Sequence, residues 1–280
     1  EKVSCIKVIT FGILSEFISI RSSKKIIPNK YWSPKRPSPI FLKFFIKFLI
    51  IVIIVGGLAG FLEISGYLYH NEILAQMAGY KTQGLDISHH QEKVNWTRVD
   101  PKYKFIILKA TEGQNFLDTD FLYNWNNARL NGFVVGAYHF FTMTSSGAAQ
   151  ADFYISKVPD SDKTLPPIID LEISTKKYKK KDVMKNLEEM VDKLEKHYKK
   201  RVIFYVNYNT YNAYIKGEFP KNKIWITDYK YFPRIKEDNR WVIWQVSRRG
   251  RIEGIPGFTD KNVLRKGMTV EDLIEQNRIN

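Results

Sequence analysis

Cysteine is nearly absent from this chain, because one residue, Cys5, occurs among 280. No disulfide can form within residues 81–280, and that region offers neither a cysteine nucleophile nor a cysteine-ligated metal. Phosphate-binding signatures are absent too, since neither G-x-G-x-x-G nor G-x-x-x-x-G-K-[ST] occurs. A domain of about 200 residues must then be stabilised by its hydrophobic core alone, which that length permits.

Charge is absent from the apolar segment Phe48–Leu62, and no Lys or Arg occurs between residues 48 and 80. Residues 1–47 carry ten Lys or Arg and only two acids. Extended to residues 44–69, the segment is long enough to cross a bilayer. The positive-inside rule then places its N-terminal side in the cytoplasm. The alternatives are a buried helix of a soluble protein and a cleaved signal peptide with Gly57–Ala59 as the cleavage site.

These patterns predict a basic tail at 1–43, a transmembrane anchor at 44–69, a linker at 70–80 and one folded domain at 81–280. The protein would span the cytoplasmic membrane once, with its C-terminal domain in the periplasm or the cell-wall space. Of the formal net charge of +15, residues 1–80 contribute ten basic and four acidic groups, or +6, which leaves +9 for residues 81–280. A basic exported domain suits an anionic polymer. Nucleic acid is not an expected partner, because no basic helix or aromatic RNA-binding motif is visible.

Short β-branched and aromatic runs alternate with helical stretches from residue 81 onward. The predicted strands are Gly84–Ser88, Phe105–Ala110, Val134–Phe141, Pro167–Ile173, Val202–Asn207, Ile224–Asp228 and Val242–Ser247. Helical spacing of apolar residues predicts helices over Asp120–Asn131, Ser146–Val158 and Asp182–Tyr198. This alternation indicates an α/β fold with a mostly parallel sheet, either open and doubly wound or closed into a barrel.

Polar residues occur near the C-terminal ends of most of these strands. They are Asp86, Ser88, Lys109, Glu112, Tyr138, His139, Asp170, Glu172, Asn207, Asp228 and Gln245. Such residues at the ends of many strands are typical of an α/β barrel, whereas an open sheet gathers its site at one switch point. We therefore predict a single (β/α) barrel of TIM-like type, irregular and with fewer helices than strands, preceded by one transmembrane helix.

Two carboxylates, Asp170 and Glu172, end the apolar run that starts at Pro166. Side chains alternate along a strand, so both point to one side with their Cα atoms roughly 6.5–7 Å apart. Carboxyl groups this close resist ionising together, so one tends to stay protonated near neutral pH. A protonated acid beside an ionised partner is typical of glycoside hydrolysis. Alternatively, the two acids cap a helix or pair with Lys176 or Lys177.

Five motifs, read in order, resemble those of the family-25 glycoside hydrolases, the N-acetylmuramidase lysozymes. They are GLDISHHQ at 84–91, FIILKATEG at 105–113, GFVVGAYHFF at 132–141, D-x-E at 170–172, and WVIWQVS at 241–247 with GIPG at 254–257 and Asp260. The resemblance covers residues 81–265. Two segments depart from it, because Thr259 stands where Val is usual before Asp260, and Thr227–Asp228 replaces a common Ala-x.

The resemblance implies three catalytic residues, Glu172, Asp170 and Asp86. Glu172 would be the general acid, with its pKa raised by the neighbouring carboxylates. Asp170 would stay ionised and either stabilise positive charge on the sugar ring or steer the substrate's own N-acetyl group as nucleophile. Asp86 would form an acidic floor with Asp260 that binds and orients the sugar.

The predicted substrate-binding residues are Asp260, Tyr138, Lys109, Glu112, Asn207, Trp225, Asp228, Trp244 and Gln245. Core packing is the alternative role for the two tryptophans. We expect no metal and no cofactor, because the adjacent His89 and His90 face opposite ways on an extended segment. His139 is expected to be a hydrogen-bonded barrel residue.

The implied activity is cleavage of the β-1,4 bond between N-acetylmuramic acid and N-acetylglucosamine. A non-catalytic module that binds cell-wall polysaccharide on the same barrel is the alternative. The expected partners are peptidoglycan glycan strands and, through the N-terminal anchor, the cytoplasmic membrane. The protein is expected to be a monomer.

Overall fold

The computed structural model describes residues 37–235 and 237–279. The chain divides into two compact units, residues 1–53 and 54–280. Cys5 and residues 1–36 of the predicted basic tail lie outside the described residues. Within the described residues, one helix, α2 (Pro39–Ile64), is long and apolar enough to cross a membrane, and none of its residues is buried. It begins and ends five residues earlier than the predicted anchor, 44–69.

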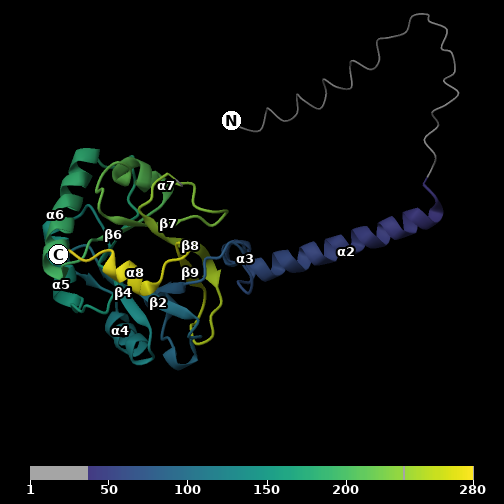
Figure 1. Cartoon of the computed structure of the whole chain (residues 1–280), viewed down its shortest axis with the longest axis horizontal. Helices are drawn as coiled ribbons and strands as arrows, with labels where there is room; N and C mark the ends of the chain where they lie inside the picture. The colour runs from purple at the N-terminus through teal and green to yellow at the C-terminus, as the bar shows by residue number, and fades with distance from the viewer. Residues whose placement is uncertain (1–36, 236, 280) are drawn as a thin grey trace, which may run out of the picture. The chain divides into compact units, whose positions relative to one another are not determined.

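Eight strands of the second unit close into a barrel (Figure 1). They are β1 (Gln83–Ile87), β2 (Tyr103–Glu112), β4 (Val134–Phe140), β5 (Ile168–Leu171), β6 (Ile203–Val206), β7 (Lys223–Thr227), β8 (Trp241–Gly250) and β9 (Thr259–Leu264). Their order around the barrel is β1-β9-β8-β7-β6-β5-β4-β2, and β2 pairs with β1 to close it. A two-residue strand, β3 (Phe116–Leu117), folds back on the end of β2.

One strand departs from the regular TIM arrangement of eight parallel strands. β9 runs antiparallel to both neighbours, β1 and β8, whereas the other seven strands are parallel. The connection between β8 and β9 covers only residues 251–258. A parallel strand needs a crossover of about a dozen residues or more, so this short connection can only form a hairpin.

Helices cover the outside of the barrel unevenly (Figure 1). Those that connect strands are α4 (Phe121–Leu130), α5 (Gly147–Lys157), α6 (Lys180–Tyr198), and α7 (Tyr208–Thr210) with the π-helical turn η3 (Tyr211–Ile215). Two short 3₁₀ turns, η1 (His89–Gln91) and η2 (Trp96–Arg98), replace a helix between β1 and β2. No helix connects β7 to β8 in the described residues of that loop. The expected irregular barrel, with fewer connecting helices than strands, is therefore present.

The predicted linker, 70–80, contains a packed helix, α3 (His70–Met77), in which Asn71 and Ala75 are buried. The Asn71 side chain donates a hydrogen bond to the Asp228 carbonyl at 2.8 Å. At the other end of the chain, α8 (Val270–Glu275) shares a hydrophobic cluster with the barrel interior. Asn277, just after α8, accepts a hydrogen bond from the backbone of Arg201 ahead of β6. α8 therefore closes the amino-terminal end of the barrel and leaves the opposite end for a site.

Candidate active site

A cavity of about 220 Å³ lies towards the carboxyl ends of the parallel strands. Each of the eight barrel strands contributes at least one residue to its lining, and the turns after β1 and β5 add two more. The lining residues are Asp86, His90, Lys109, Tyr138, Phe140, Asp170, Glu172, Tyr205, Trp225, Gln245 and Asp260. Eight of the twelve predicted site residues are therefore brought together in one cavity.

Asp86 and Asp260 form the floor pair, because they lie opposite one another on the antiparallel strands β1 and β9. Gln245 donates from its amide nitrogen to Asp86 at 2.9 Å and to Asp260 at 3.2 Å. Asn262 donates a further hydrogen bond to Asp86 at 2.7 Å. Burial raises the pKa of both carboxyl groups, and the charge of Asp86 raises that of Asp260 further. Asp86 therefore takes the negative charge of the pair and Asp260 takes the proton.

Asp170 and Glu172 differ in their surroundings. The side chain of Asp170 is 7% exposed, and its Oδ1 atom has no hydrogen-bond partner among the described residues. Burial, and then the charges of Glu172 and Asp86, raise the pKa of Asp170 well above its ordinary value. Glu172 lies just beyond β5 and is accessible from solvent, while the protein around its carboxyl group partly desolvates it and raises its pKa.

These environments change the protonation expected from the sequence. We expect an ionised Asp170 from the motif alone, but burial without a hydrogen-bond donor favours its neutral form. Desolvation, rather than the charge of neighbouring carboxylates, raises the pKa of Glu172. The pair still holds a proton at a pH where isolated carboxyl groups would have lost theirs.

Polar and aromatic side chains complete the cavity wall. Lys109 forms a 2.7 Å ion pair with Glu112, so Glu112 adjoins the cavity through its partner without lining it. Trp225 donates from its indole nitrogen to Asn262 at 2.8 Å. The Tyr205 hydroxyl donates to the side-chain amide oxygen of Gln245 at 2.8 Å. Gln245 is therefore oriented by a tyrosine while its amide nitrogen faces both floor carboxylates.

Three predicted substrate-binding residues lie away from the cavity lining. Asn207 caps α7 by accepting hydrogen bonds from the backbones of Asn209 and Thr210. Asp228 is buried and accepts a 2.7 Å hydrogen bond from Tyr208. Trp244 is 0% exposed in the hydrophobic core, and its indole nitrogen donates to the Asp228 carbonyl. The Asn207 side-chain oxygen, the Asp228 carboxylate and the Trp244 indole nitrogen are already hydrogen-bonded within the protein, so the core-packing role applies to Trp244.

Three lining residues, His90, Phe140 and Tyr205, were not predicted from the sequence as parts of the site. Strand alternation could have indicated two of them, because Phe140 lies on the same strand face as the predicted Tyr138, and Tyr205 on the same face as the predicted Asn207. His90 follows β1 in the turn η1, where no alternation applies. His89 instead contacts Asp118, with its ring nitrogen 2.6 Å from the carboxylate.

The histidine and acidic side chains of the described residues are not arranged as a metal centre. Within residues 37–235 and 237–279, no group of three or more His, Cys, Asp or Glu side chains is placed to hold a metal ion. His139 is 0% exposed and lies within 2.7 Å of Thr111 and 3.0 Å of Gln150. Burial lowers its pKa to about 4, so it is a neutral, hydrogen-bonded barrel residue at neutral pH.

Comparison with known proteins gives consistent matches over the barrel. Residues 85–255 match the family described as Glycosyl hydrolases family 25. Protein YegX of Escherichia coli K12 is 32% identical over 202 residues, which cover 70% of this chain and 73% of YegX. Lysozyme M1 of Streptomyces globisporus is 31% identical over 204 residues, covering 64% of this chain and 66% of that protein. The structure of a family 25 glycosyl hydrolase from Bacillus anthracis is similar with a TM-score of 0.65 and 35% identity, covering 70% and 93% of the two chains.

Proposed function

The chain belongs to glycosyl hydrolase family 25, and we propose that it cleaves the β-1,4 bond between N-acetylmuramic acid and N-acetylglucosamine in peptidoglycan. It is a peptidoglycan hydrolase of the lysozyme type. The observation that carries the proposal is the convergence of four carboxyl groups in one cavity formed by all eight strands. A module that only binds polysaccharide does not need such a cluster, because buried carboxyl groups without partners cost stability.

Glu172 is the general acid in this proposal. Its exposed side chain can approach a glycosidic oxygen that enters the cavity, and its raised pKa keeps part of the population protonated. In the first step its proton passes to the leaving oxygen as the glycosidic bond breaks. In the second step the carboxylate removes a proton from the water that attacks the anomeric carbon, and the bond from that carbon to the substrate's acetamido oxygen breaks.

Asp170 acts on the substrate's acetamido group. Its neutral form makes a poor nucleophile and a poor stabiliser of positive charge, which favours the substrate-assisted route. The unpartnered Oδ1 atom accepts a hydrogen bond from the acetamido N–H, and the acetamido oxygen attacks the anomeric carbon.

Asp86, Asp260 and Gln245 hold the sugar from the opposite side of the cavity. The protonated Asp260 donates its hydrogen bond to the ionised Asp86, and the remaining carboxyl oxygens of the pair can accept hydrogen bonds from sugar hydroxyl groups. Tyr138, Trp225 and Lys109 line the remaining wall and shape the space left for the ring.

The test is the substitution Glu172→Gln, which keeps the shape of the side chain and removes the proton donor. Hydrolysis of purified peptidoglycan, measured as new reducing ends, should fall by about 10²–10⁴-fold with unchanged thermal unfolding, because general acid catalysis contributes that much. Glu188→Gln, an exposed acid on α6, is the matched control and should retain full activity. Activity of Glu172→Gln within a few-fold of the unmodified protein would exclude this role.

We also propose that α2 anchors the enzyme in the cytoplasmic membrane, with the barrel in the periplasm or the cell-wall space and the protein acting as a monomer. Support comes from the exposed apolar surface of α2 and the ten basic residues in residues 1–47. A helix with that surface is stable in hydrocarbon, because its backbone polar groups are satisfied internally. The basic side then remains in the cytoplasm.

A further inference from the structure

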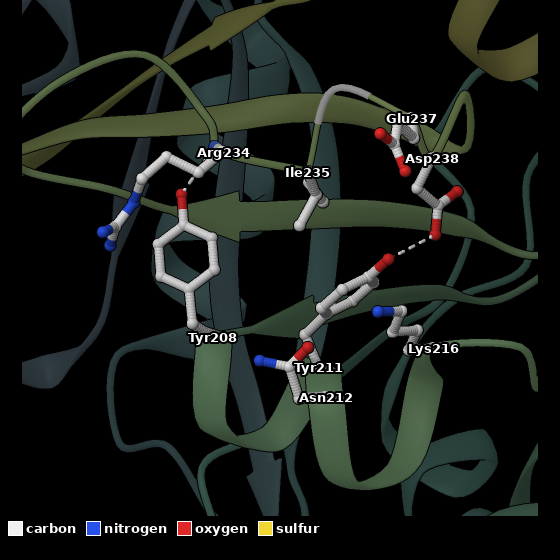
Figure 2. A pocket seen from close by; sticks show the side chains of 8 residues that line it. All are labelled: Tyr208, Tyr211, Asn212, Lys216, Arg234, Ile235, Glu237 and Asp238. Atoms are coloured by element: carbon white, nitrogen blue, oxygen red, sulfur yellow. Dashed lines mark hydrogen bonds between the residues drawn. The ribbon is translucent and has the colours of Figure 1, made fainter.

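A second and larger cavity, of about 660 Å³, is formed by the segment after β6 and the connection between β7 and β8. Figure 2 shows its lining side chains, which are Tyr208, Tyr211, Asn212, Lys216, Arg234, Ile235, Glu237 and Asp238. Its volume lies within the range of about 300–1,000 Å³ that is usual for small-ligand sites. None of these residues belongs to the carboxylate cavity.

Hydrogen bonds fix the two walls of this cavity to one another. The Tyr208 hydroxyl donates to Asp228 at 2.7 Å and accepts from the Arg234 backbone at 2.9 Å. The Tyr211 hydroxyl donates to Asp238 at 2.9 Å. Figure 2 shows both tyrosines extending towards the β7–β8 connection, with Ile235 between them. Tyr211 begins a π-helical turn, a feature that is frequent at functional sites.

Charges of both signs remain available at the opening. The side chains of Lys216, Arg234 and Glu237 are exposed, and Arg234 forms an ion pair with Asp228 at 3.4 Å. Among the described residues, neither the Lys216 ammonium nor the Glu237 carboxylate forms a hydrogen bond or an ion pair. The charge of Asp238 is already matched by Arg240 at 2.7 Å. The cavity can therefore pair with a ligand that carries a carboxylate and an ammonium group together.

A bare sugar is a poor match for this lining. Sugar rings bind to exposed flat faces of aromatic side chains, but Tyr211 is only 4% exposed. The Arg234 guanidinium covers the Tyr208 ring, with its central carbon 4.4 Å from the ring centroid. The charged groups of the lining suit a peptide better.

The two cavities adjoin one another on the chain. Tyr205 lines the carboxylate cavity, and Tyr208, three residues later, lines the second one. Three residues span at most about 10 Å. Asp228 accepts a hydrogen bond from Tyr208 of the second cavity. The hydroxyl of the next residue, Tyr229, donates a hydrogen bond to Gln245 of the carboxylate cavity. A peptide that leaves the carboxylate cavity therefore meets the Tyr208 end of the second cavity first, and Lys216 and Glu237, which precede the starts of β7 and β8, lie further along it.

We propose that the second cavity binds the peptide part of the substrate, a short peptide with free carboxylates and a side-chain ammonium group. The proposal rests on the function stated above, since peptidoglycan joins such peptides to the glycan that enters the carboxylate cavity. Lys216 pairs with a peptide carboxylate, and Glu237 pairs with the ammonium group. The enzyme then selects strands that carry peptides over bare glycan.

The test measures binding of a synthetic tetrapeptide without sugar, bearing two carboxylates and one side-chain ammonium, to the full chain in detergent micelles. We expect a dissociation constant near 1 mM, the weak range for a small ligand. Lys216→Ala and Glu237→Ala should each weaken binding by about 2- to 5-fold, as expected for exposed ion pairs. Lys221→Ala, an exposed lysine outside this lining, is the control and should bind as the unmodified protein does.

Acetylation of the peptide's ammonium group makes the assignment specific. It should weaken binding to the unmodified protein and have no further effect on Glu237→Ala, because the partner charge is then already gone. Absence of peptide binding, or equal binding by both cavity variants and the control, would overturn the proposal. Tighter binding of a neutral N-acetylglucosamine tetramer at this cavity would overturn it as well. Hydrolysis of peptide-free glycan, measured separately, reports on the proposed function whatever the peptide result.

Discussion

At the floor of the carboxylate cavity, neighbouring amide donors decide which acid keeps its proton. Asp86 accepts hydrogen bonds from Gln245 and Asn262 at 2.9 and 2.7 Å, whereas Asp260 accepts one from Gln245 at 3.2 Å. Hydrogen bonds to a carboxylate favour its charged form. The negative charge is therefore best stabilised on Asp86, and the pKa of Asp260 is raised further.

We predict that Asp260→Asn makes the protein more stable at pH 8. The pKa of Asp260 is higher in the folded protein than the value of about 3.9 in an unfolded chain. At a pH between the unfolded and the folded pKa of Asp260, the folded state binds more protons than the unfolded state. The free energy of unfolding therefore falls as pH rises through this range and stays lower above it. Asn mimics the protonated acid and removes this loss. We expect the melting temperature to rise by about 2–4 °C for each kcal/mol recovered.

Thermal unfolding followed by circular dichroism at pH 8 and pH 4 measures this effect. The gain should shrink at pH 4, where Asp260 is largely protonated in the folded protein and partly protonated in the unfolded chain. Asp192→Asn, an exposed acid on α6, should change little at either pH. A lower melting temperature of Asp260→Asn at pH 8 would show that its carboxyl group stabilises the fold. Activity should fall in either case, as is common when a strained site is relieved.

Strand alternation explains how much of the site can be predicted. Residues such as Tyr138, Asp170 and Gln245 lie on strands, where the period of two fixes the face that a side chain takes. Trp244 alternates with Gln245, so its side chain lies on the outer face of the barrel, where it is buried in the hydrophobic core. The state of the Asp170 proton depends on burial and on absent donors, neither of which the motif encodes.

At the scale of the elements, all seven predicted strands form, because each is a β-branched or aromatic run bounded by turn residues. β9 was not predicted, since four of the six residues in its sequence Thr-Asp-Lys-Asn-Val-Leu are polar and the segment lies in a motif noted for chemistry. α3 and α8 were not predicted either, because they have only eight and six residues. Elements this short are stabilised by tertiary contacts rather than by their own periodicity.

The contact between α5 and α6 leads to a prediction for Gly147. A Cβ atom at this position would lie 1.7 Å from the backbone oxygen of Asn186, and backbone cannot move aside as a flexible side chain can. We expect Gly147→Ala to destabilise the domain by about 1–3 kcal/mol, the usual cost of overpacking. Denaturant unfolding measures this change. Ser156→Ala, at an exposed position of the same helix, is the control. Unchanged stability of Gly147→Ala would mean that the two helices can separate at little cost.

The apolar helix α2 leads to a prediction for intact cells. If α2 spans the membrane with the basic side inside, protease added to spheroplasts should release a fragment close to the barrel in size. A cytoplasmic marker protein should stay intact in the same sample. Complete protection of the barrel, or a natural N-terminus near residue 60 in a soluble exported fraction, would contradict the anchor.

At the scale of the whole molecule, charge and catalysis are separated. The carboxylate cavity is enclosed by all eight strands, while most lysines are exposed on the surface. Residues 81–280 carry a net charge of +9, obtained from +15 for the chain minus +6 for residues 1–80. Long-range attraction to an anionic wall therefore comes from the surface, whereas bond cleavage comes from the carboxyl groups that line the cavity, of which only Glu172 is exposed.

This separation predicts different salt dependence for wall binding and for turnover. The Debye length falls from about 10 Å at 0.1 M to about 3 Å at 1 M, so attraction between surface lysines and peptidoglycan carboxylates should weaken over that range. We expect the affinity for intact sacculi to fall, measured by co-sedimentation of Glu172→Gln so that the polymer stays uncut. Turnover of a short soluble glycan fragment at saturating concentration should change little, because at saturation the rate no longer depends on attraction between the surface lysines and the substrate. Equal salt sensitivity of both measurements would mean that the surface charge does not recruit the enzyme to the wall and that the lysines only keep the domain soluble.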